Sequence, residues 1–137
     1  MKILYVLGEF PKLSETFILN QITGLIDKGH QVTILANENP LENKKHADVH
    51  KYDLMSRVKY FQLPKSIKKR LIKAPVVFLR SFFRMPIQTI NSINFIKYKK
   101  EAVSLRLLYS TAALVGEENE FDIINCHFGP NGILGTS

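Results

Sequence analysis

The stretch Gly8–Phe17, which reads GEFPKLSETF, decides the fold because it joins the clearest strand pattern to the clearest helix start. The preceding run Lys2–Leu7 is short, apolar and ended by Gly8, which is typical of a strand buried on both faces. Within the stretch, Ser14 is a natural N-cap and Glu15 adds negative charge to the first helical turn. The sequence therefore predicts a strand, a connecting loop and a helix that begins after Ser14.

A second pattern continues the helix and adds another strand. Leu13 and Ile18 occupy the two positions of a hydrophobic staple, and Gly29 is placed to end the helix in the left-handed conformation. The run Gln31–Ala36 has the composition of a strand. The apolar face of the helix consists of Ile18, Ile22, Leu25 and Ile26. We therefore predict a βαβ unit with a right-handed crossover, within an α/β fold of the Rossmann-like type: a parallel sheet flanked by helices.

The loop between the first strand and the helix is a candidate site from its position alone, because ligands of open parallel sheets lie beyond the carboxyl ends of the strands. Amides at the start of the helix could bind a phosphate or a carboxylate, since that end carries unsatisfied donors and a partial positive charge. The loop contains Gly8 but lacks the glycine spacing of a dinucleotide fingerprint or a P-loop. Nicotinamide, flavin and ATP sites of those types are disfavoured. The alternative is that the loop only connects strand and helix.

Length and composition indicate one domain without disulfide support. A chain of 137 residues is long enough to bury about two-thirds of its unfolded surface. Cys126 is the only cysteine, and no acidic or cysteine partner completes a metal site with His46 and His50, so no metal site is expected. The start of the sequence has no signal-peptide layout, and no apolar stretch approaches the roughly 20 residues of a membrane span. We expect a soluble or peripheral protein in a reducing cytosol.

The formal charge of +7 is concentrated in one segment. Arg57–Arg106 contains 13 Lys and Arg residues and one acidic residue, Glu101, which gives +12, while the remainder has 6 basic and 11 acidic residues, which gives −5. Such asymmetry favours an anionic partner. A membrane surface is favoured over nucleic acid, because no nucleic-acid-binding motif accompanies the basic residues. The alternative is that these charges belong to solvated helix faces.

The basic segment also contains an unusually apolar piece. From about Leu54 to Lys100 the pattern is helical, and Pro64, Pro75 and Pro86 are expected to break it into pieces. The central piece begins at Pro75 and is bracketed by basic residues, which is typical of an amphipathic helix on an anionic leaflet; a buried core helix is the alternative. The candidate membrane-binding residues are Lys68, Lys69, Arg70, Lys73, Phe78, Phe82, Phe83 and Arg84.

The remaining segments complete the predicted sheet. Asn37–Asp48 is polar and reads as an exposed loop, and Val49–Tyr52 is a candidate third strand. Glu101–Val115 has the pattern of a helix, and Phe121–Cys126 that of the last strand. His127 follows this strand as the opening loop follows the first strand, so we expect both loops at one edge of the sheet. A histidine there can donate a hydrogen bond to a phosphate or hydroxyl.

Four pieces of sequence together resemble a known family. They are Gly8–Ile18, Gly29–Val32, Phe121-Asp122 and His127–Gly132, in this order and spacing. They look like the N-terminal domain of family 4 GT-B glycosyltransferases, particularly the bacterial enzymes of colanic acid and exopolysaccharide assembly. The resemblance implies two Rossmann-like domains facing a cleft. It also implies sugar transfer from a nucleotide-sugar with retention of configuration, without a bound metal or other cofactor.

The resemblance also implies roles for individual residues. His127 matches the cleft histidine of the family, which hydrogen-bonds the transferring sugar or assists the reaction. In the family, this loop and the first residues of the helix line the cleft near the donor phosphates and the acceptor. The corresponding residues here are Gly8, Glu9, Phe10, Pro11, Lys12, Ser14 and Glu15. The loop of the histidine is shaped by Phe128, Gly129 and Asn131.

The chain departs from the family in one large respect. It lacks the C-terminal nucleotide-sugar domain and its Glu-x7-Glu motif, so we expect residues 1–137 to form a truncated acceptor-side domain without transferase activity alone. The family's use of lipid-linked acceptors suggests a cytoplasmic protein at the inner face of the plasma membrane. The competing hypothesis is a catalytically inactive, free-standing membrane- or partner-binding module with the same fold.

Overall fold

The computed structural model describes residues 1–40, 46–84, 86–94, 105–114 and 121–127. Its centre is a four-stranded sheet in the order β3-β2-β1-β4, in which all neighbouring strands are parallel. The strands are β1 (Lys2–Glu9), β2 (Gln31–Glu38), β3 (Val58–Tyr60) and β4 (Ile123–Cys126). The predicted Rossmann-like α/β sheet is confirmed, and β1 and β2 extend beyond the predicted ends at Leu7 and Ala36.

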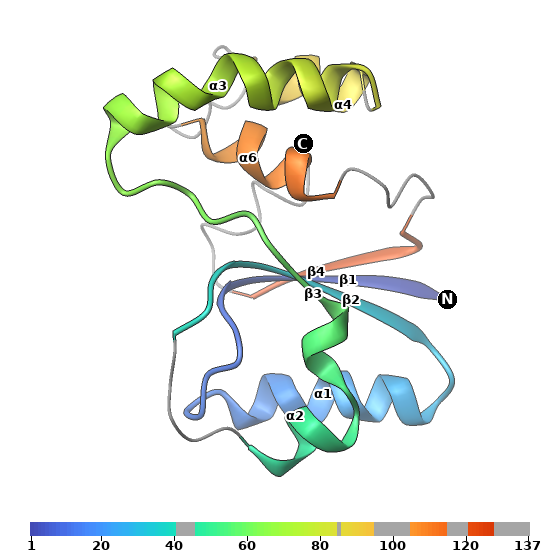
Figure 1. The fold of residues 1–137 in the computed structure, drawn as a ribbon. Coiled ribbons are helices and arrows are strands. Elements are labelled where there is room, and N and C mark those ends of the chain that lie inside the picture. Colours follow the sequence, from blue (N-terminus) through green and yellow to red (C-terminus); the bar gives the residue numbers. More distant parts are fainter. Residues whose placement is uncertain (41–45, 85, 95–104, 115–120, 128–137) are drawn as a thin grey trace.

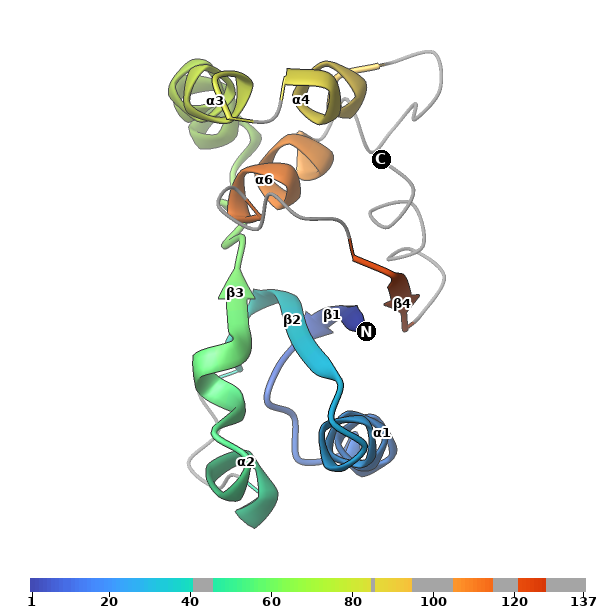
Figure 2. The same ribbon diagram turned by 90° about the vertical axis from the view of Figure 1, so that its right-hand side faces the viewer.

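Helices cover both faces of the sheet, as Figure 1 and Figure 2 show. The helices on one face are α1 (Thr16–Asp27) and α2 (Ala47–Lys51). The helices on the other face are α3 (Ile67–Phe82), α4 (Pro86–Ser92) and α6 (Arg106–Ala113). A short 3-10 helix, η1 (Leu54–Arg57), leads into β3. The described elements therefore form a three-layer arrangement with the sheet in the middle.

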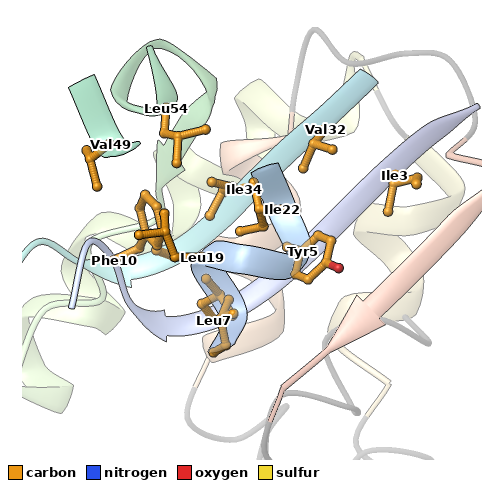
Figure 3. Packing of buried hydrophobic residues seen from close by; sticks show 12 residues of the cluster. Ile3, Tyr5, Leu7, Phe10, Leu19, Ile22, Val32, Ile34, Val49 and Leu54 are labelled. Carbon is orange, nitrogen blue, oxygen red and sulfur yellow. The ribbon is translucent and has the colours of Figure 1, made fainter. Parts of the chain in front are cut away.

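β1 is the centre of the core because both of its faces are buried. Ile3, Tyr5 and Leu7 belong to the cluster between the sheet and α1, which Figure 3 shows from close by. Leu4 and Val6 belong to a second cluster that includes the buried side chains of α6. Successive side chains of a strand point to opposite faces, so a continuous apolar run fills both layers at once. The predicted two-sided burial is confirmed.

The predicted start of the first helix is wrong by one residue. Glu15, not Ser14, is the N-cap of α1, and its side chain makes no capping hydrogen bond. The amide of Glu15 donates to the carbonyl of Lys12 at 3.2 Å, and the helical bonds begin at the carbonyl of Glu15. Residues Lys12 to Glu15 therefore form a backbone turn, and the helix begins at Thr16, one residue later than the capping pattern predicted. With Glu15 as the N-cap, the staple position before the cap belongs to Ser14, so Leu13, which lies in this turn and is exposed, does not occupy it.

The predicted end of α1 is confirmed. Gly29 has a φ of 81° and donates its amide to the carbonyl of Ile26 at 2.9 Å. His30 donates to the carbonyl of Leu25 at 3.1 Å. These two bonds define a Schellman motif. The motif requires a left-handed residue at the position of Gly29, and glycine adopts this conformation without a steric penalty because it has no Cβ.

The predicted third strand, Val49–Tyr52, is wrong, because this segment lies in and just after α2. The helix is capped by His46, whose Nδ1 accepts a hydrogen bond from the Asp48 amide at 3.4 Å, and Val49 is buried against the core. The third strand is β3, which lies inside the segment predicted to be helical. A strand of three residues is too short to show a hydrophobic period in the sequence. The segment becomes a strand because it pairs with β2.

Pro75 does not break the helix as predicted, because α3 continues through it. A proline inside a helix leaves the carbonyl four residues earlier without its usual donor. That carbonyl belongs to Leu71, and both Leu71 and Pro75 lie on the exposed side of α3, where water can hydrate it. Pro64 lies before α3 and Pro86 begins α4, so these two breaks are confirmed.

The predicted carboxyl-terminal elements are present where the structure describes them. α6 lies within the predicted helix Glu101–Val115, and its residues Leu107 and Leu108 are buried. β4 lies within the predicted strand Phe121–Cys126 and pairs with β1.

Candidate functional site

The two predicted loops meet at one edge of the sheet because β1 and β4 are parallel neighbours. Val6 of β1 is in register with Cys126 of β4, and the amide of His127 donates to the carbonyl of Val6 at 3.2 Å. The carboxyl ends of both strands therefore open on the same side, at the left in Figure 1. This placement of His127 beside the β1–α1 loop is the arrangement predicted from the sequence.

The ring of His127 lies between two aromatic rings. It stacks on Tyr5 with 5.6 Å between centroids, and it meets the edge of Phe17 at 5.8 Å. Burial raises the pKa of the Tyr5 phenol, and a side-chain hydrogen bond with Asn125 partly offsets that rise. Phe17 comes from the first turn of α1 and is half exposed, so the histidine is held at the boundary between core and solvent. Tyr5 and Phe17 were not among the predicted site residues, since each occupies an ordinary apolar position in its pattern.

The loop after β1 contains a compact group of charges. The ammonium of Lys12 lies 3.4 Å from a carboxylate oxygen of Glu9 and 3.7 Å from one of Glu15. The hydrogen bond with Glu9, followed by the attraction of both carboxylates, raises the pKa of Lys12. Two carboxylates against one ammonium leave this group with a formal charge of −1, which weakens its attraction for a phosphate.

These charges line a pocket of about 340 Å³ at the carboxyl ends of β1 and β2. Its walls are Gly8, Glu9, Lys12, Glu15, Asn37, Glu38 and Arg106. Arg106 begins α6 and approaches the loop from the opposite layer of the fold. Asn37, Glu38 and Arg106 were not among the predicted site residues. The pairing of β2 with β1 brings Asn37 and Glu38 to the opening loop, and the packing of α6 over the sheet brings Arg106 there.

Phe10 and Pro11 belong to the structural part of the loop. Both are buried, and the amide of Phe10 donates to the carbonyl of Glu38 at 3.3 Å. The hydroxyl of Tyr60 donates to the carbonyl of Phe10 at 2.7 Å, and burial raises the pKa of that phenol. These contacts anchor the loop to β2 and β3. Ser14 is exposed in the turn before α1.

Three predicted site residues, Phe128, Gly129 and Asn131, lie outside the described residues. Within the described part of the chain, no group of three or more His, Cys, Asp or Glu side chains is arranged to hold a metal ion. His46 acts as the cap of α2, and His50 is exposed on that helix.

The predicted membrane-binding residues divide into outward and inward groups. Phe78 packs against the second core cluster, and Phe82 stacks on it at 5.7 Å. Arg70 is half-buried, and its Nε donates to the carbonyl of Pro64. The outward group consists of Lys68, Lys69, Lys73, Phe83 and Arg84. None of the helices that the structure describes is both long and apolar enough to cross a membrane.

Comparison with known proteins finds relatives along nearly the whole chain. The colanic acid biosynthesis glycosyltransferases provisionally named WcaL, from Salmonella typhimurium and from Escherichia coli, are each 34% identical to it over 137 residues. The amylovoran biosynthesis glycosyltransferase AmsK of Erwinia amylovora is 32% identical over 139 residues. No protein-family model matches the chain, and no solved structure matches it significantly.

Each match covers 99% of this chain and 33% of the relative, so the chain spans about a third of the length of these relatives. The match is consistent with the predicted N-terminal glycosyltransferase domain. The predicted resemblance is thereby confirmed: along 99% of its length, this chain is similar to glycosyltransferases of bacterial exopolysaccharide biosynthesis.

Proposed function

We propose that this chain is the acceptor-side part of a retaining GT-B glycosyltransferase, which moves a sugar from a nucleotide-sugar to a saccharide in exopolysaccharide or cell-surface polysaccharide synthesis. The observation that carries the proposal is the position of His127 at the carboxyl end of β4, stacked on Tyr5 beside the β1–α1 loop. Ligands of open parallel sheets bind at this edge. The similarity to exopolysaccharide glycosyltransferases supports the same class of reaction.

The reaction requires stabilisation of the nucleoside diphosphate that leaves the donor sugar. The amides at the start of α1 lie at the edge where this charge would develop, and preorganised donors of this kind lower such barriers. His127 hydrogen-bonds the transferring sugar and orients it. The nucleotide-sugar is a substrate, and the scheme uses no metal or other cofactor.

The charged pocket is assigned to the acceptor saccharide. Its carboxylates, from Glu9, Glu15 and Glu38, outnumber the two cations, Lys12 and Arg106. Carboxylates accept hydrogen bonds from hydroxyl groups, whereas they repel the phosphates of a donor. A volume of about 340 Å³ lies at the lower end of the range for small-molecule sites, which suits one sugar unit.

The acceptor is proposed to be lipid-linked, and the protein to be peripheral at the cytoplasmic face of the plasma membrane. Exposed apolar and basic side chains on α3 support this location. Residues 1–137 alone are expected to transfer no sugar, because the chain spans a third of its relatives and contains no Glu-x7-Glu motif.

A second candidate function rests on the same exposed surface. A free-standing, catalytically inactive membrane- or partner-binding module would need α3 but not the His127 site. The two candidates are separated by whether the site supports transfer in a longer protein that carries this chain.

The test is sugar transfer by that longer protein, measured as radiolabel moved from a nucleotide-sugar into a lipid extract. His127→Ala should lower kcat about 100-fold, the lower end of the range for removal of one positioned hydrogen-bond donor. His50→Ala is the matched control, because His50 is exposed on α2 and does not line the charged pocket, and it should leave the rate unchanged. Equal rates for the two variants would remove His127 from the site, whereas the absence of transfer by the unmutated longer protein would leave the binding module as the better candidate.

A further inference from the structure

α3 presents a row of exposed apolar side chains to the outside of the molecule. Ile72, Val76, Leu79 and Phe83 follow one another at spacings of four, three and four residues, which places them on one face of α3, with Phe83 directly after the last helical residue. Their exposed fractions are 76%, 71%, 57% and 77%. The apolar row begins before the predicted break at Pro75, because the helix continues through this proline.

A row of basic side chains runs directly beside the apolar row. Lys69, Lys73, Arg80 and Arg84 follow one another at spacings of four, seven and four residues, and all four are exposed. Helical spacing puts the basic row along one side of the apolar row, whereas Ile67 and Leu71 lie on the other side of the apolar row. The outward side of α3 is therefore amphipathic in itself, with its apolar row exposed rather than buried.

α4 extends this outer surface. Its side chains Ile87 and Ile90 are exposed at 70% and 53%, while Thr89 and Ser92 are fully buried toward the interior. In Figure 2 the two helices are seen side by side at the top, with α6 between them and the sheet. We call the outward side chains of the two helices the α3–α4 surface. It consists of Ile67, Leu71, Ile72, Val76, Leu79, Phe83, Ile87 and Ile90, with the basic row Lys69, Lys73, Arg80 and Arg84.

The charges of this surface select its occupant. Arg57–Arg106 contains one acidic residue against 13 basic residues, so a second copy docked through the same surface would bring two cationic rows together. A nucleic acid would be attracted by the cations but would leave the aliphatic row exposed to water. An anionic lipid leaflet satisfies both rows, because its acyl region accepts the apolar side chains and its headgroups attract the basic ones.

We infer that the α3–α4 surface lies on an anionic membrane leaflet, with the apolar row inserted at the boundary between the headgroups and the acyl region and the basic row among the headgroups. This inference deepens the proposed function and rests on it for its biological purpose. In Figure 1 the axis of α3 lies roughly parallel to the strands, although the helix runs in the opposite direction, so the carboxyl edge of the sheet opens sideways along the membrane. A lipid-linked saccharide held in that leaflet would reach His127 and Lys12 from the side.

The first test is sedimentation of the 137-residue chain with vesicles of phosphatidylglycerol and phosphatidylcholine. The chain should sediment with these vesicles and not with pure phosphatidylcholine. The double variant Lys69→Gln/Lys73→Gln should weaken binding about fivefold for each charge removed. The control Lys28→Gln/Lys51→Gln removes two exposed charges elsewhere and should bind like the parent chain. Equal binding by the two double variants would overturn the assignment of this surface.

The second test uses tryptophan fluorescence, because the chain contains no tryptophan. Phe83→Trp places a reporter on the apolar row, and Phe17→Trp places one at the site edge; both positions are exposed. Anionic vesicles should shift the emission of the Phe83→Trp reporter to shorter wavelength and leave that of Phe17→Trp unchanged. A shift of the Phe83→Trp emission with protein concentration in the absence of vesicles would assign the surface to a second copy and overturn the inference.

Neither test includes a sugar donor or acceptor, so the outcomes are independent of catalysis. Loss of transfer in His127→Ala with normal sedimentation would support the role of His127 in the site and leave the membrane assignment unaffected. Loss of sedimentation in Lys69→Gln/Lys73→Gln, with normal transfer to a water-soluble acceptor by the longer protein, would concern the membrane surface alone.

Discussion

The imidazole of His127 stacks on the phenol of Tyr5, with 5.6 Å between the ring centroids and 14° between the ring planes. Tyr5 lies in the middle of β1 and is in register with Asn125 of β4. The same ring is part of the cluster between the sheet and α1. The candidate site residue is therefore supported directly by the hydrophobic core.

Removal of the Tyr5 ring should destabilise the fold and displace His127. Tyr5 is 2% exposed, so Tyr5→Ala should lower the free energy of unfolding by about 3–5 kcal/mol, measured by urea denaturation. Tyr5→Phe keeps the ring and removes only the hydroxyl, and it should cost about 1 kcal/mol. A small loss in the alanine variant would contradict the observed burial of this ring.

The ion pairs of Lys12 predict a pH dependence at alkaline pH. The hydrogen bond and attraction from Glu9, and the attraction from Glu15, raise the pKa of Lys12 above its ordinary value of 10.5. A raised pKa in the folded state means that the stabilisation is complete below the ordinary value and is lost as the pH rises through the folded value. NMR titration of the Lys12 Nζ should give a lower pKa in Glu9→Gln than in the parent chain. An unchanged pKa would show that Glu9 and Lys12 do not pair in solution.

Replacement of Pro75 should stabilise the protein. Pro75 lies inside α3, where it removes an amide donor from the helix. Pro75→Ala restores that donor and should raise the free energy of unfolding by about 2 kcal/mol, less than the full penalty because proline also restricts the unfolded chain. Pro64→Ala is the control, since Pro64 lies outside the helix, and it should give no such gain. Destabilisation by Pro75→Ala would contradict a continuous α3.

Two glycines of the first βαβ unit should respond in opposite directions to alanine. Gly29 has a φ of 81°, so Gly29→Ala should cost about 1–2 kcal/mol although no atom lies within 4 Å of the added Cβ. Gly24 lies inside α1 with the same open space around it, so Gly24→Ala should stabilise by up to about 1 kcal/mol. Thermal denaturation of the two variants provides the comparison, and equal shifts would contradict the left-handed helix end.

The sequence by itself determined the features that depend on neighbouring residues. The apolar run of β1, the helical spacing of α1 and the left-handed Gly29 follow from local sterics and from burial of a periodic face. The position of His127 at the sheet edge followed from the same information, because parallel strands bring their carboxyl ends to one side. These predictions needed only the order of strands and helices along the chain.

Only the tertiary structure decided the rest. β3 is three residues long and exists because it pairs with β2, and the amide of Phe61 continues that pairing by donating to the carbonyl of Ala36 at 3.1 Å. Arg106 reaches the charged pocket only through the packing of α6 over the sheet. Contacts between segments this far apart in sequence leave no local period or spacing, so their energy becomes visible only when the chain is folded.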